Sequence, residues 1–294
     1  MKQVTLKPIK EIVWATDLSR ESKVCVPYIR YFNEALSVNN HAVYVLPKIS
    51  DWVYEKTFFA TEDFFAEIKQ SVNLSFKKVE KYCKSLNLDF KVAVEQGVES
   101  EEILKYAETN EVDLLMVGKK GISEINDLII GSTTSRIIRN SNTPVLVVTS
   151  LKRSAKIKKV LCPIDFGELS LSELNYSLSV AEQFGAELYT AHISEFFNYK
   201  VPVFKRDKLI ESINTKIQSI ASAADYSITD TLYDMGEPAQ KILEIAKKGK
   251  FDLIVMAANQ KHGAERLFLG SITEKVLMNS NIPILIIPPV KYVQ

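Results

Sequence analysis

The sequence predicts an α/β protein made of two tandem copies of one unit, each a parallel sheet with helices on both faces. Three observations predict this fold class. The last part of the chain repeats the middle part at a constant offset. The strand-like runs are apolar throughout, as in strands that are buried on both faces. Segments with a helical period lie between these runs, and alternating strands and helices favour a parallel sheet.

The repeat is clearest in the second half of each copy, where matching segments lie 139 positions apart. The pairs are Val112–Val117 with Phe251–Met256, Gly131-Ser132 with Gly270-Ser271, Ser141–Pro144 with Ser280–Pro283, and Gly97 with Gly236. The openings, Ile12–Asp17 and Val160–Asp165, lie 148 positions apart, so the first copy has nine extra residues between Asp17 and Gly97. We therefore expect a first domain at residues 1–151 and a second at 156–294, each of normal domain size.

The elements of each copy follow from the same patterns. The expected strands include Ile12–Asp17, Leu114–Val117, Val145–Val148, Ile254–Met256 and Ile284–Ile287. The expected helices of the first copy are Ser19–Ser37, Glu62–Leu86, Ser100–Thr109 and Ser132–Asn140. The joint between the copies, Leu151–Lys158, is basic and too short to let the domains drift apart.

A glycine pattern between a strand and a helix of the first copy is the main chemical signal. Gly118 and Gly121 follow the strand, and Gly131-Ser132 opens the next helix. Glycine lets backbone approach a ligand closely, and a helix start offers unpaired N–H groups and a partial positive charge. This arrangement suits a phosphate or a phosphorylated sugar. The alternative is that such loops are packing features, with Asp17 serving only as a helix N-cap.

The pattern Gly-x2-Gly-x9-Gly-Ser, after a Val-Gly strand end and before Ser-Asn-Thr-Pro-Val-Leu-Val-Val, resembles the nucleotide-binding branch of the universal stress protein (UspA) family. The resemblance implies two tandem Rossmann-like domains of the adenine nucleotide α-hydrolase-like type. Each domain would have a five-stranded parallel sheet in the order 3-2-1-4-5. Ligands of such sheets bind where the winding reverses, which here is between the strand ending near Asp17 and the strand ending at Gly118.

The resemblance also implies roles for particular residues of the first copy. The aspartate matching Asp17 helps to hold the base, and the matching glycines and serine hold ribose and phosphates. Lys119 and Lys120, whose positions the family motif does not fix, could neutralise phosphate charge. The expected binding residues are Asp17, Ala15, Lys48, Val117, Gly118, Lys119, Gly121, Gly131, Ser132 and Thr133. The expected ligand is ATP or a related adenine nucleotide, with Mg as its candidate counter-ion.

The second copy departs from the pattern and predicts a degenerate site. It keeps Asp165, Gly270 and Ser271, but it has Ala257 and Gln260 at the two leading glycine positions. A methyl group and a long side chain would stand where bare backbone should approach phosphate. The corresponding strand end carries His192-Ile193, so Ile193 completes the degenerate set. We expect a lost or altered nucleotide site there; a pocket for another polar ligand is the alternative.

Bulk properties exclude several classes of protein. With 37 basic and 36 acidic residues the net charge is +1, which is no footprint for nucleic acid. No apolar stretch reaches the roughly 20 residues of a membrane span, and no signal peptide is visible. Three separated cysteines indicate a reducing, cytoplasmic setting, and three isolated histidines make no metal site. We expect His41 at the surface and His192 packed and hydrogen-bonded.

Three classes of function fit this sequence unequally. The first is a regulatory or stress-response sensor that binds nucleotide in its first domain. The second is an interaction or scaffold module without nucleotide, whose copies pair through Val145–Thr149 and Ile284–Pro288, with a homodimer as a further candidate. The third is an enzyme, but no general base stands with a nucleophile in the motif region, so we expect no catalytic residues and at most slow ATP hydrolysis.

Overall fold

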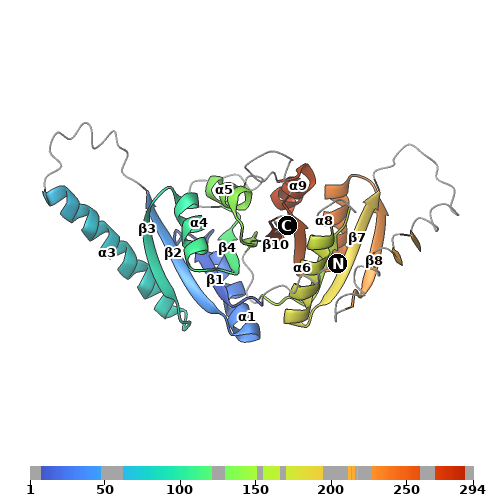
Figure 1. Cartoon of the computed structure of the whole chain (residues 1–294), viewed down its shortest axis with the longest axis horizontal. Helices are drawn as coiled ribbons and strands as arrows, with labels where there is room; N and C mark the ends of the chain where they lie inside the picture. Colours follow the sequence, from blue (N-terminus) through green and yellow to red (C-terminus); the bar gives the residue numbers. More distant parts are fainter. Residues whose placement is uncertain are drawn as a thin grey trace, which may run out of the picture.

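The chain folds around one continuous ten-stranded sheet with the strand order β3-β2-β1-β4-β5-β10-β9-β6-β7-β8 (Figure 1). The computed structural model describes residues 8–47, 62–120, 130–150, 155–165, 170–194, 211–212, 214–215, 217, 227–258 and 269–288. Every strand pair within one copy is parallel. The α/β class is therefore confirmed.

The first copy supplies one half of the sheet. Its elements are β1 (Glu11–Ala15), the short 3-10 helix η1 (Lys23–Cys25), α1 (Val26–Leu36), β2 (Asn39–Pro47), α3 (Glu62–Ser85), β3 (Lys91–Gly97), α4 (Glu99–Thr109), β4 (Leu114–Gly118), α5 (Ser132–Asn140) and β5 (Val145–Val148). The spatial order β3-β2-β1-β4-β5 is the expected 3-2-1-4-5.

The second copy repeats this order with the same connections. Its elements are β6 (Lys159–Pro163), α6 (Ser170–Phe184), β7 (Glu187–Ser194), β8 (Asp230–Met235), α8 (Pro238–Lys248), β9 (Leu253–Ala257), α9 (Ser271–Asn279) and β10 (Ile284–Ile287). Read from its own third strand, the order is β8-β7-β6-β9-β10. The internal repeat in the sequence is therefore a repeat of topology.

The two halves are joined edge to edge through their last strands. β5 and β10 pair in antiparallel fashion, with Leu146 opposite Leu285 and Val147 opposite Ile284. This pairing gives hydrogen-bond partners to backbone groups of two edge strands that would otherwise be unpaired. The expected pairing of the last strands thus occurs within one chain.

The hydrophobic core divides by sheet face, and each part includes residues of both copies. One cluster, beneath α1, α3 and α6, contains Trp14 of β1 and Cys162 of β6. The other, beneath α4, α5, α8 and α9, contains Leu115 of β4 and Ile254 of β9. On the first face the aromatic rings of Phe32 and Phe184 meet across the halves with centroids 4.8 Å apart. The core therefore does not stop at the joint between the copies.

The described part of the connector between the two copies, residues 155–158, is partly buried. The basic stretch contains Ala155 and Ile157, which are both buried, while Lys156 and Lys158 are exposed. The Tyr31 hydroxyl of α1 donates a hydrogen bond of 3.2 Å to the Ile157 carbonyl. The connector is thus held against the first copy. Among the described residues, no helix is long and apolar enough to cross a membrane.

The first helix begins later than the sequence indicates. The expectation was a helix from Ser19, but η1 starts at Lys23 and α1 at Val26. Hydroxyl groups hold the preceding residues in an irregular loop: the Leu18 and Ser22 amides donate to Thr16 Oγ1 and Ser19 Oγ, each over 3.0 Å. Serine and threonine side chains compete in this way with helical hydrogen bonds.

Candidate functional site

The sheet topology fixes where a ligand crevice can lie in the first copy. β1 pairs with β2 on one side and β4 on the other, and Trp14 lies opposite Met116 in the β1–β4 register. The carboxyl ends of β1 and β4 are therefore neighbours, and the connections from them leave in opposite directions along the sheet. This is the reversal point at which open α/β sheets bind their ligands.

Asp17 stands just beyond the end of β1 at this edge. Its Oδ1 accepts a hydrogen bond of 2.9 Å from the Ser19 amide, and its side chain is half-buried. That contact is a local turn of the kind aspartate commonly makes. No helix begins at Ser19, because η1 starts at Lys23 with Ser22 as its N-cap, so the contact is not a helix cap. It fixes the carboxylate at the mouth of the crevice.

Gly118 ends β4 and packs against the loop that follows β1. A Cβ built on Gly118 would lie 2.3 Å from the Glu21 carbonyl oxygen, which is a backbone atom. Real Cβ atoms essentially never come so close, and backbone cannot move aside as a flexible side chain can. The protein's own chain therefore requires glycine at this position.

The segment from Gly118 to Gly131 is called the glycine loop, and its two ends lie beside each other at the end of β4. The Gly131 amide donates to the Lys119 carbonyl over 2.8 Å, and the Thr134 hydroxyl donates to the Gly118 carbonyl over 2.8 Å. Thr134 is buried. The start of α5 is thus tied directly to the end of β4, which fixes the helix N-terminus at the crevice.

Gly131 differs from Gly118 because nothing in the fold demands a glycine there. Its backbone has φ −54°, which every residue adopts, and a Cβ would meet its nearest atoms, in Lys119 and Lys120, at 3.4 Å. That separation is ordinary van der Waals contact. Gly131 is itself buried, but the described protein atoms would tolerate a methyl group there and do not require glycine.

The N-terminus of α5 is chemically suited to an anion. No described side chain caps it, and its first turn contains no acidic residue. Ser132 is exposed and Thr133 half-exposed, so hydroxyl groups stand beside the first helical N–H groups. Amides at a helix start carry partial positive charge and lack partners inside the helix.

Lys119 is used differently from the expectation. Its ammonium was a candidate for phosphate, but the side chain is only 8% exposed and donates a hydrogen bond to the Met278 carbonyl of α9 in the second copy. Lys120, the next residue, is half-buried. One of the two lysines of the glycine loop therefore reaches across the joint between the copies.

The other expected residues of this site fall into two groups. Val117 is 3% exposed and belongs to the core on the α5 face, so its side chain serves packing and only its backbone lies near the edge. Ala15 is half-exposed at the end of β1. Lys48 and Gly121 lie outside the described residues.

The corresponding edge of the second copy contains a carboxyl group that the sequence analysis missed. Glu173 lies in the first turn of α6, is 8% exposed, and its Oε1 accepts a hydrogen bond of 3.0 Å from the Ala257 amide at the end of β9. Ala257 holds the place that Gly118 has in the first copy. The repeat puts Cys25 at the position of Glu173.

Burial governs the charge of this carboxyl group. Removal from water raises the pKa of Glu173 well above its ordinary value, the Ala257 hydrogen bond opposes the shift, and the charge of Asp165 adds to it. In the sequence, the only sign of this buried carboxyl group is one glutamate among the mostly apolar or small residues in the first part of α6. That signal is weak because helical glutamates usually face solvent.

The remaining residues of the degenerate set keep their positions in the fold. Asp165 is exposed after β6, and Ile193 is half-buried in β7. Gly270 precedes α9 with φ −57°, and Ser271 is exposed as the first helical residue. The Thr273 hydroxyl lies 3.4 Å from the Ala257 carbonyl, the counterpart of the Thr134 contact. Gln260 lies outside the described residues.

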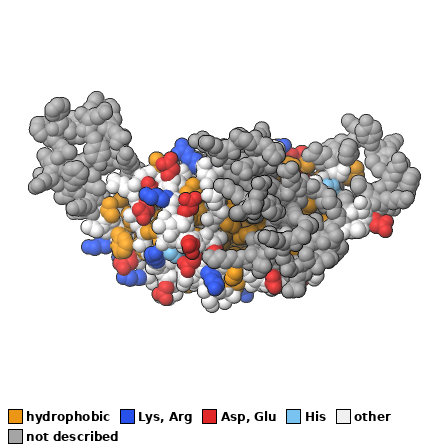
Figure 2. All heavy atoms as spheres, viewed as in Figure 1, with side chains coloured by type: hydrophobic (Ala, Val, Ile, Leu, Met, Phe, Trp, Pro, Cys, Tyr) orange, Lys and Arg blue, Asp and Glu red, His pale blue; other side chains and the backbone are white. Residues whose placement is uncertain are grey.

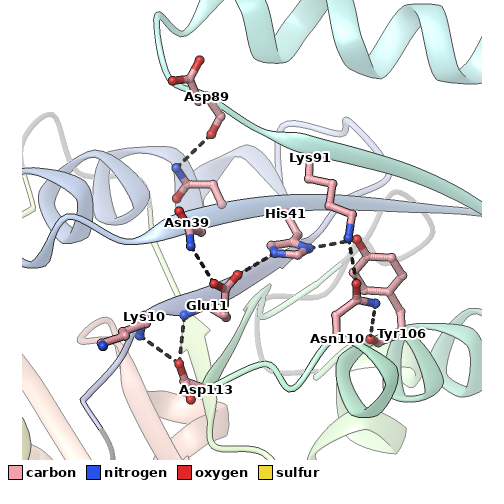
Figure 3. Close-up of polar contacts among 10 residues, drawn as sticks. Lys10, Glu11, Asn39, His41, Asp89, Lys91, Tyr106, Asn110 and Asp113 are labelled. Carbon is pink, nitrogen blue, oxygen red and sulfur yellow. Dashed lines mark hydrogen bonds and ion pairs between the residues drawn. The ribbon is translucent and has the colours of Figure 1, made fainter.

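A second polar cluster lies at the opposite, amino edge of the first copy's strands (Figure 3). His41 was expected at the surface, but it is 6% exposed. Its Nδ1 is 2.9 Å from the Tyr106 hydroxyl, and its Nε2 is 2.9 Å from Glu11 Oε2. The surface expectation was wrong because β2 and α4 bury the ring, and the two partners satisfy both ring nitrogens.

Glu11 links this cluster to the start of β2. Burial would raise the pKa of Glu11, but hydrogen bonds from Asn39 and His41 outweigh it and hold the pKa below its usual value. Asp113 nearby accepts hydrogen bonds of 2.9 Å from the Lys10 and Glu11 amides (Figure 3). This cluster lies at the edge opposite the crevice, so it stabilises the strand starts.

Only the backbone part of the cluster repeats in the second copy. Asp252 accepts hydrogen bonds from the Lys158 and Lys159 amides over 3.0 and 3.2 Å, as Asp113 does in the first copy. Lys159 and Tyr189 stand where the first copy has Glu11 and His41. The aspartate is therefore part of the common fold, and the histidine cluster is particular to the first copy.

No group of three or more His, Cys, Asp or Glu side chains that could hold a metal ion occurs among the described residues. His192 is packed as expected, with Nδ1 2.8 Å from the Ile164 carbonyl. On the face drawn in Figure 2, acidic and basic side chains are interspersed over the first copy.

Comparison with known proteins identifies the family that has this architecture. A sequence model of the Universal stress protein family matches residues 8–149 and again residues 156–288. Universal stress protein MJ0531 of Methanocaldococcus jannaschii is 30% identical over 139 residues, covering 44% of this chain and 81% of that protein. Universal stress protein MJ0577 of the same organism is 27% identical over 154 residues, covering 47% and 94%.

A solved structure matches over nearly the whole length. The crystal structure of a universal stress protein from Archaeoglobus fulgidus DSM 4304 covers 95% of this chain and 98% of its own, with a TM-score of 0.67 and 19% identity. At this identity the likeness establishes the fold alone, and it does so for both copies together.

Proposed function

Because the chain belongs to the universal stress protein family, we propose that its first domain, residues 1–151, binds an adenine nucleotide in the crevice between β1 and β4. ATP is the expected ligand, with Mg as its candidate counter-ion. Domain 2, residues 156–294, would leave its own crevice without nucleotide. The protein would act in the cytoplasm as a regulatory or stress-response sensor.

The observation that carries this proposal is that the described backbone does not require glycine at position 131. Gly118 must be glycine because the Glu21 carbonyl is 2.3 Å from the place of a Cβ, but Gly131 has no such neighbour. A phosphate group on the N–H groups of α5 would use the space that a side chain at position 131 would fill. The requirement for glycine there would come from the ligand.

The other groups at this edge fit a nucleotide laid from β1 towards α5. The Asp17 carboxylate accepts hydrogen bonds, which suits the base or the ribose. Ser132 and Thr133 offer hydroxyl donors beside the helix amides. Phosphate binding of this kind depends on backbone dipoles, so it does not need the ammonium of Lys119.

Domain 2 lacks the conditions for the same ligand. At the position of Gly118 it has Ala257, whose amide is already bonded to the Glu173 carboxyl group. Asp165 is the counterpart of Asp17, and its charge helps to raise the pKa of Glu173. The buried Glu173 side chain stands at the position of Cys25 and occupies this edge with a polar group of the protein itself, so one nucleotide is expected per chain.

A module that works without nucleotide is the second candidate. The close packing of Gly118 on Glu21 favours it, because glycine at that position is explained by the fold alone. In that case domain pairing through β5 and β10 would be the purpose of the tandem arrangement. Dedicated catalysis has less support than either, since neither crevice brings together a nucleophile and a base among the described residues.

Gly131→Ala tests the nucleotide proposal without disturbing the fold. The added methyl group meets protein atoms at ordinary contact distance, so stability should change by no more than about 1 kcal/mol. Titration calorimetry with ATP–Mg should show affinity at least about tenfold weaker than in the unaltered protein, because the methyl group takes the place of a phosphate contact.

Gly270→Ala is the matched control, because Gly270 opens α9 with nearly the same backbone angles as Gly131, φ −57° and −54°. It should leave affinity and stoichiometry unchanged. Equal binding by the Gly131→Ala protein, or loss of binding only in the Gly270→Ala protein, would contradict the proposed site. Absence of any binding by the unaltered protein would favour the nucleotide-free module.

A further inference from the structure

We propose that Lys119 couples nucleotide binding in domain 1 to the end of helix α9 in domain 2. This inference rests on the proposed function, because it describes the regulation of that same site. Lys119 lies in the glycine loop of domain 1, and its side chain contacts domain 2. Its ammonium donates a hydrogen bond to the Met278 carbonyl.

The backbone of Lys119 is part of the proposed site. Its amide donates to the Val148 carbonyl of β5 over 2.9 Å, and its carbonyl accepts the Gly131 amide over 2.8 Å. Any ligand that contacts Gly131 or the start of α5 therefore acts on groups bonded to Lys119. The hydrogen bond between Gly131 and Lys119 is the first link of the coupling.

The side chain of Lys119 reaches a helix end that benefits from a cation. Met278 lies in the last turn of α9, where carbonyl groups have no partners within the helix and carry partial negative charge. Lys119 is more than nine-tenths buried, so water screens this interaction little. α5 and α9 lie on the same face of the sheet near its middle (Figure 1).

A second contact joins the same two helices. Arg139 near the end of α5 lies 3.3 Å from Glu274 in the first turn of α9. Lys119 and Arg139 therefore contact opposite ends of α9, and both belong to segments tied to the nucleotide edge of domain 1. A shift of the glycine loop has a short physical route to domain 2.

The contact is made from domain 1 to domain 2, and the repeat does not preserve it in the other direction. Ala258 stands at the position of Lys119 in domain 2, and Arg139 stands at the position of Met278 in domain 1. Alanine has no ammonium group, so Ala258 cannot make the corresponding hydrogen bond to domain 1. The domain expected to bind nucleotide is thus the one whose loop contacts its neighbour.

Hydrogen exchange measured by mass spectrometry on the full chain tests the link. In the unaltered protein, saturating ATP–Mg should slow exchange in peptides covering the last turn of α9. Lys119→Met should make the same amides exchange about two- to fivefold faster without nucleotide, and it should abolish their response to nucleotide. Lys119→Arg, which keeps the charge, should restore the response at least in part.

Ser150→Ala is the matched control. Ser150 also donates across the domain interface, to the Asn281 carbonyl over 3.0 Å, but it lies outside the glycine loop. Its removal should leave the nucleotide response of α9 intact. Because coupling is reciprocal, Lys119→Met should also change the affinity for ATP, whereas Ser150→Ala should not.

The outcomes separate this inference from the proposed function. If calorimetry shows that ATP binds and the last turn of α9 does not respond, the coupling is wrong and the nucleotide site stands. If ATP does not bind, the proposed function and the coupling both fail. If Lys119→Met leaves exchange in α9 unchanged without nucleotide, the mechanical link itself is refuted.

Discussion

Glycines of one chain serve different physical purposes, and the structure separates them. Gly97 and Gly236 have φ +159° and +147° at the strand-to-helix junctions after β3 and β8, in the region that other residues rarely adopt. Gly118 has no room for a side chain. Gly131 has ordinary backbone angles, and a Cβ there would stand at ordinary contact distance from protein atoms. The described fold therefore explains glycine at the first three positions and does not require it at position 131.

At this scale we predict that Gly118→Ala destabilises the protein whether or not nucleotide is present. The methyl group would overlap the Glu21 carbonyl, and the two backbone segments would have to separate. The expected loss is about 1–3 kcal/mol, the usual range for overpacking. Denaturant unfolding of the Gly118→Ala protein beside the Gly131→Ala protein measures it. Equal stability of the two variants would show that the packing of Gly118 is not as close as described.

At the scale of elements, helix α6 shows how a repeat can change chemistry while keeping its shape. The Glu173 side chain joins the first turn of α6 to the end of β9 through the Ala257 amide. Cys162 of β6 lies close enough for the Glu173 charge to add to the burial that raises the pKa of its thiol. The crevice proposed to bind a nucleotide in domain 1 has a counterpart in domain 2 that contains an internal carboxyl group.

This carboxyl group makes stability depend on pH in a defined direction. The pKa of Glu173 is raised in the folded protein above its value in the unfolded chain. Its contribution is therefore complete below the unfolded pKa, about 4.3, and it is lost as the pH rises through the folded pKa. The charge that acts on it comes from Asp165 after β6.

We predict that Glu173→Gln raises stability at pH 8 by on the order of 1–2 kcal/mol, because the amide keeps a hydrogen-bond acceptor without a buried charge. The gain should vanish near pH 4. Thermal unfolding across this pH range measures it. Glu182→Gln, at an exposed position of the same helix, should give no such pH dependence. A variant less stable than the unaltered protein at pH 8 would contradict the assignment.

At the scale of the whole molecule, two domains share one sheet and one core. β5 and β10 connect the halves through backbone hydrogen bonds, and both hydrophobic clusters contain residues from each domain. Aromatic side chains of α1 and α6 pack across the joint. Neither domain could separate without exposing part of both clusters.

We therefore predict one cooperative unfolding transition for the full chain. Calorimetry should give a single peak whose calorimetric and van't Hoff enthalpies agree. Saturating ATP–Mg should move the whole peak upward, because a ligand that binds only the folded state stabilises everything that unfolds with it. Two separated peaks, or a shift of only part of one peak, would show that the domains unfold independently.

Much of the fold could be predicted because the repeat and the apolar runs are local signals. The 3-2-1-4-5 order, which the resemblance implied, is confirmed in both halves, and α5 has the expected bounds. The start of the first helix was wrong by several residues, because hydroxyl groups of Thr16, Ser19 and Ser22 compete with the helical backbone. Such competition depends on geometry that propensity does not describe.

The candidate site was predictable in part. The spacing of Gly118, Gly131 and Ser132 indicated a loop at a helix start, and the structure ties that loop to the sheet edge. The roles of Lys119 and His41 were not predictable. Each depends on a partner far away in the sequence, Met278 for the lysine and Glu11 with Tyr106 for the histidine.

The sequence by itself determined the α/β class and the tandem repeat, because apolar periodicity and glycine spacing are written along the chain. Tertiary structure alone decided which glycine is held by the protein's own backbone and which leaves space. It also decided that Glu173 enters the second crevice and that Lys119 spans the two domains. The physical reason is that burial, close contact and pairing across long separations depend on which surfaces meet, and that is settled only when the sheet closes through β5 and β10.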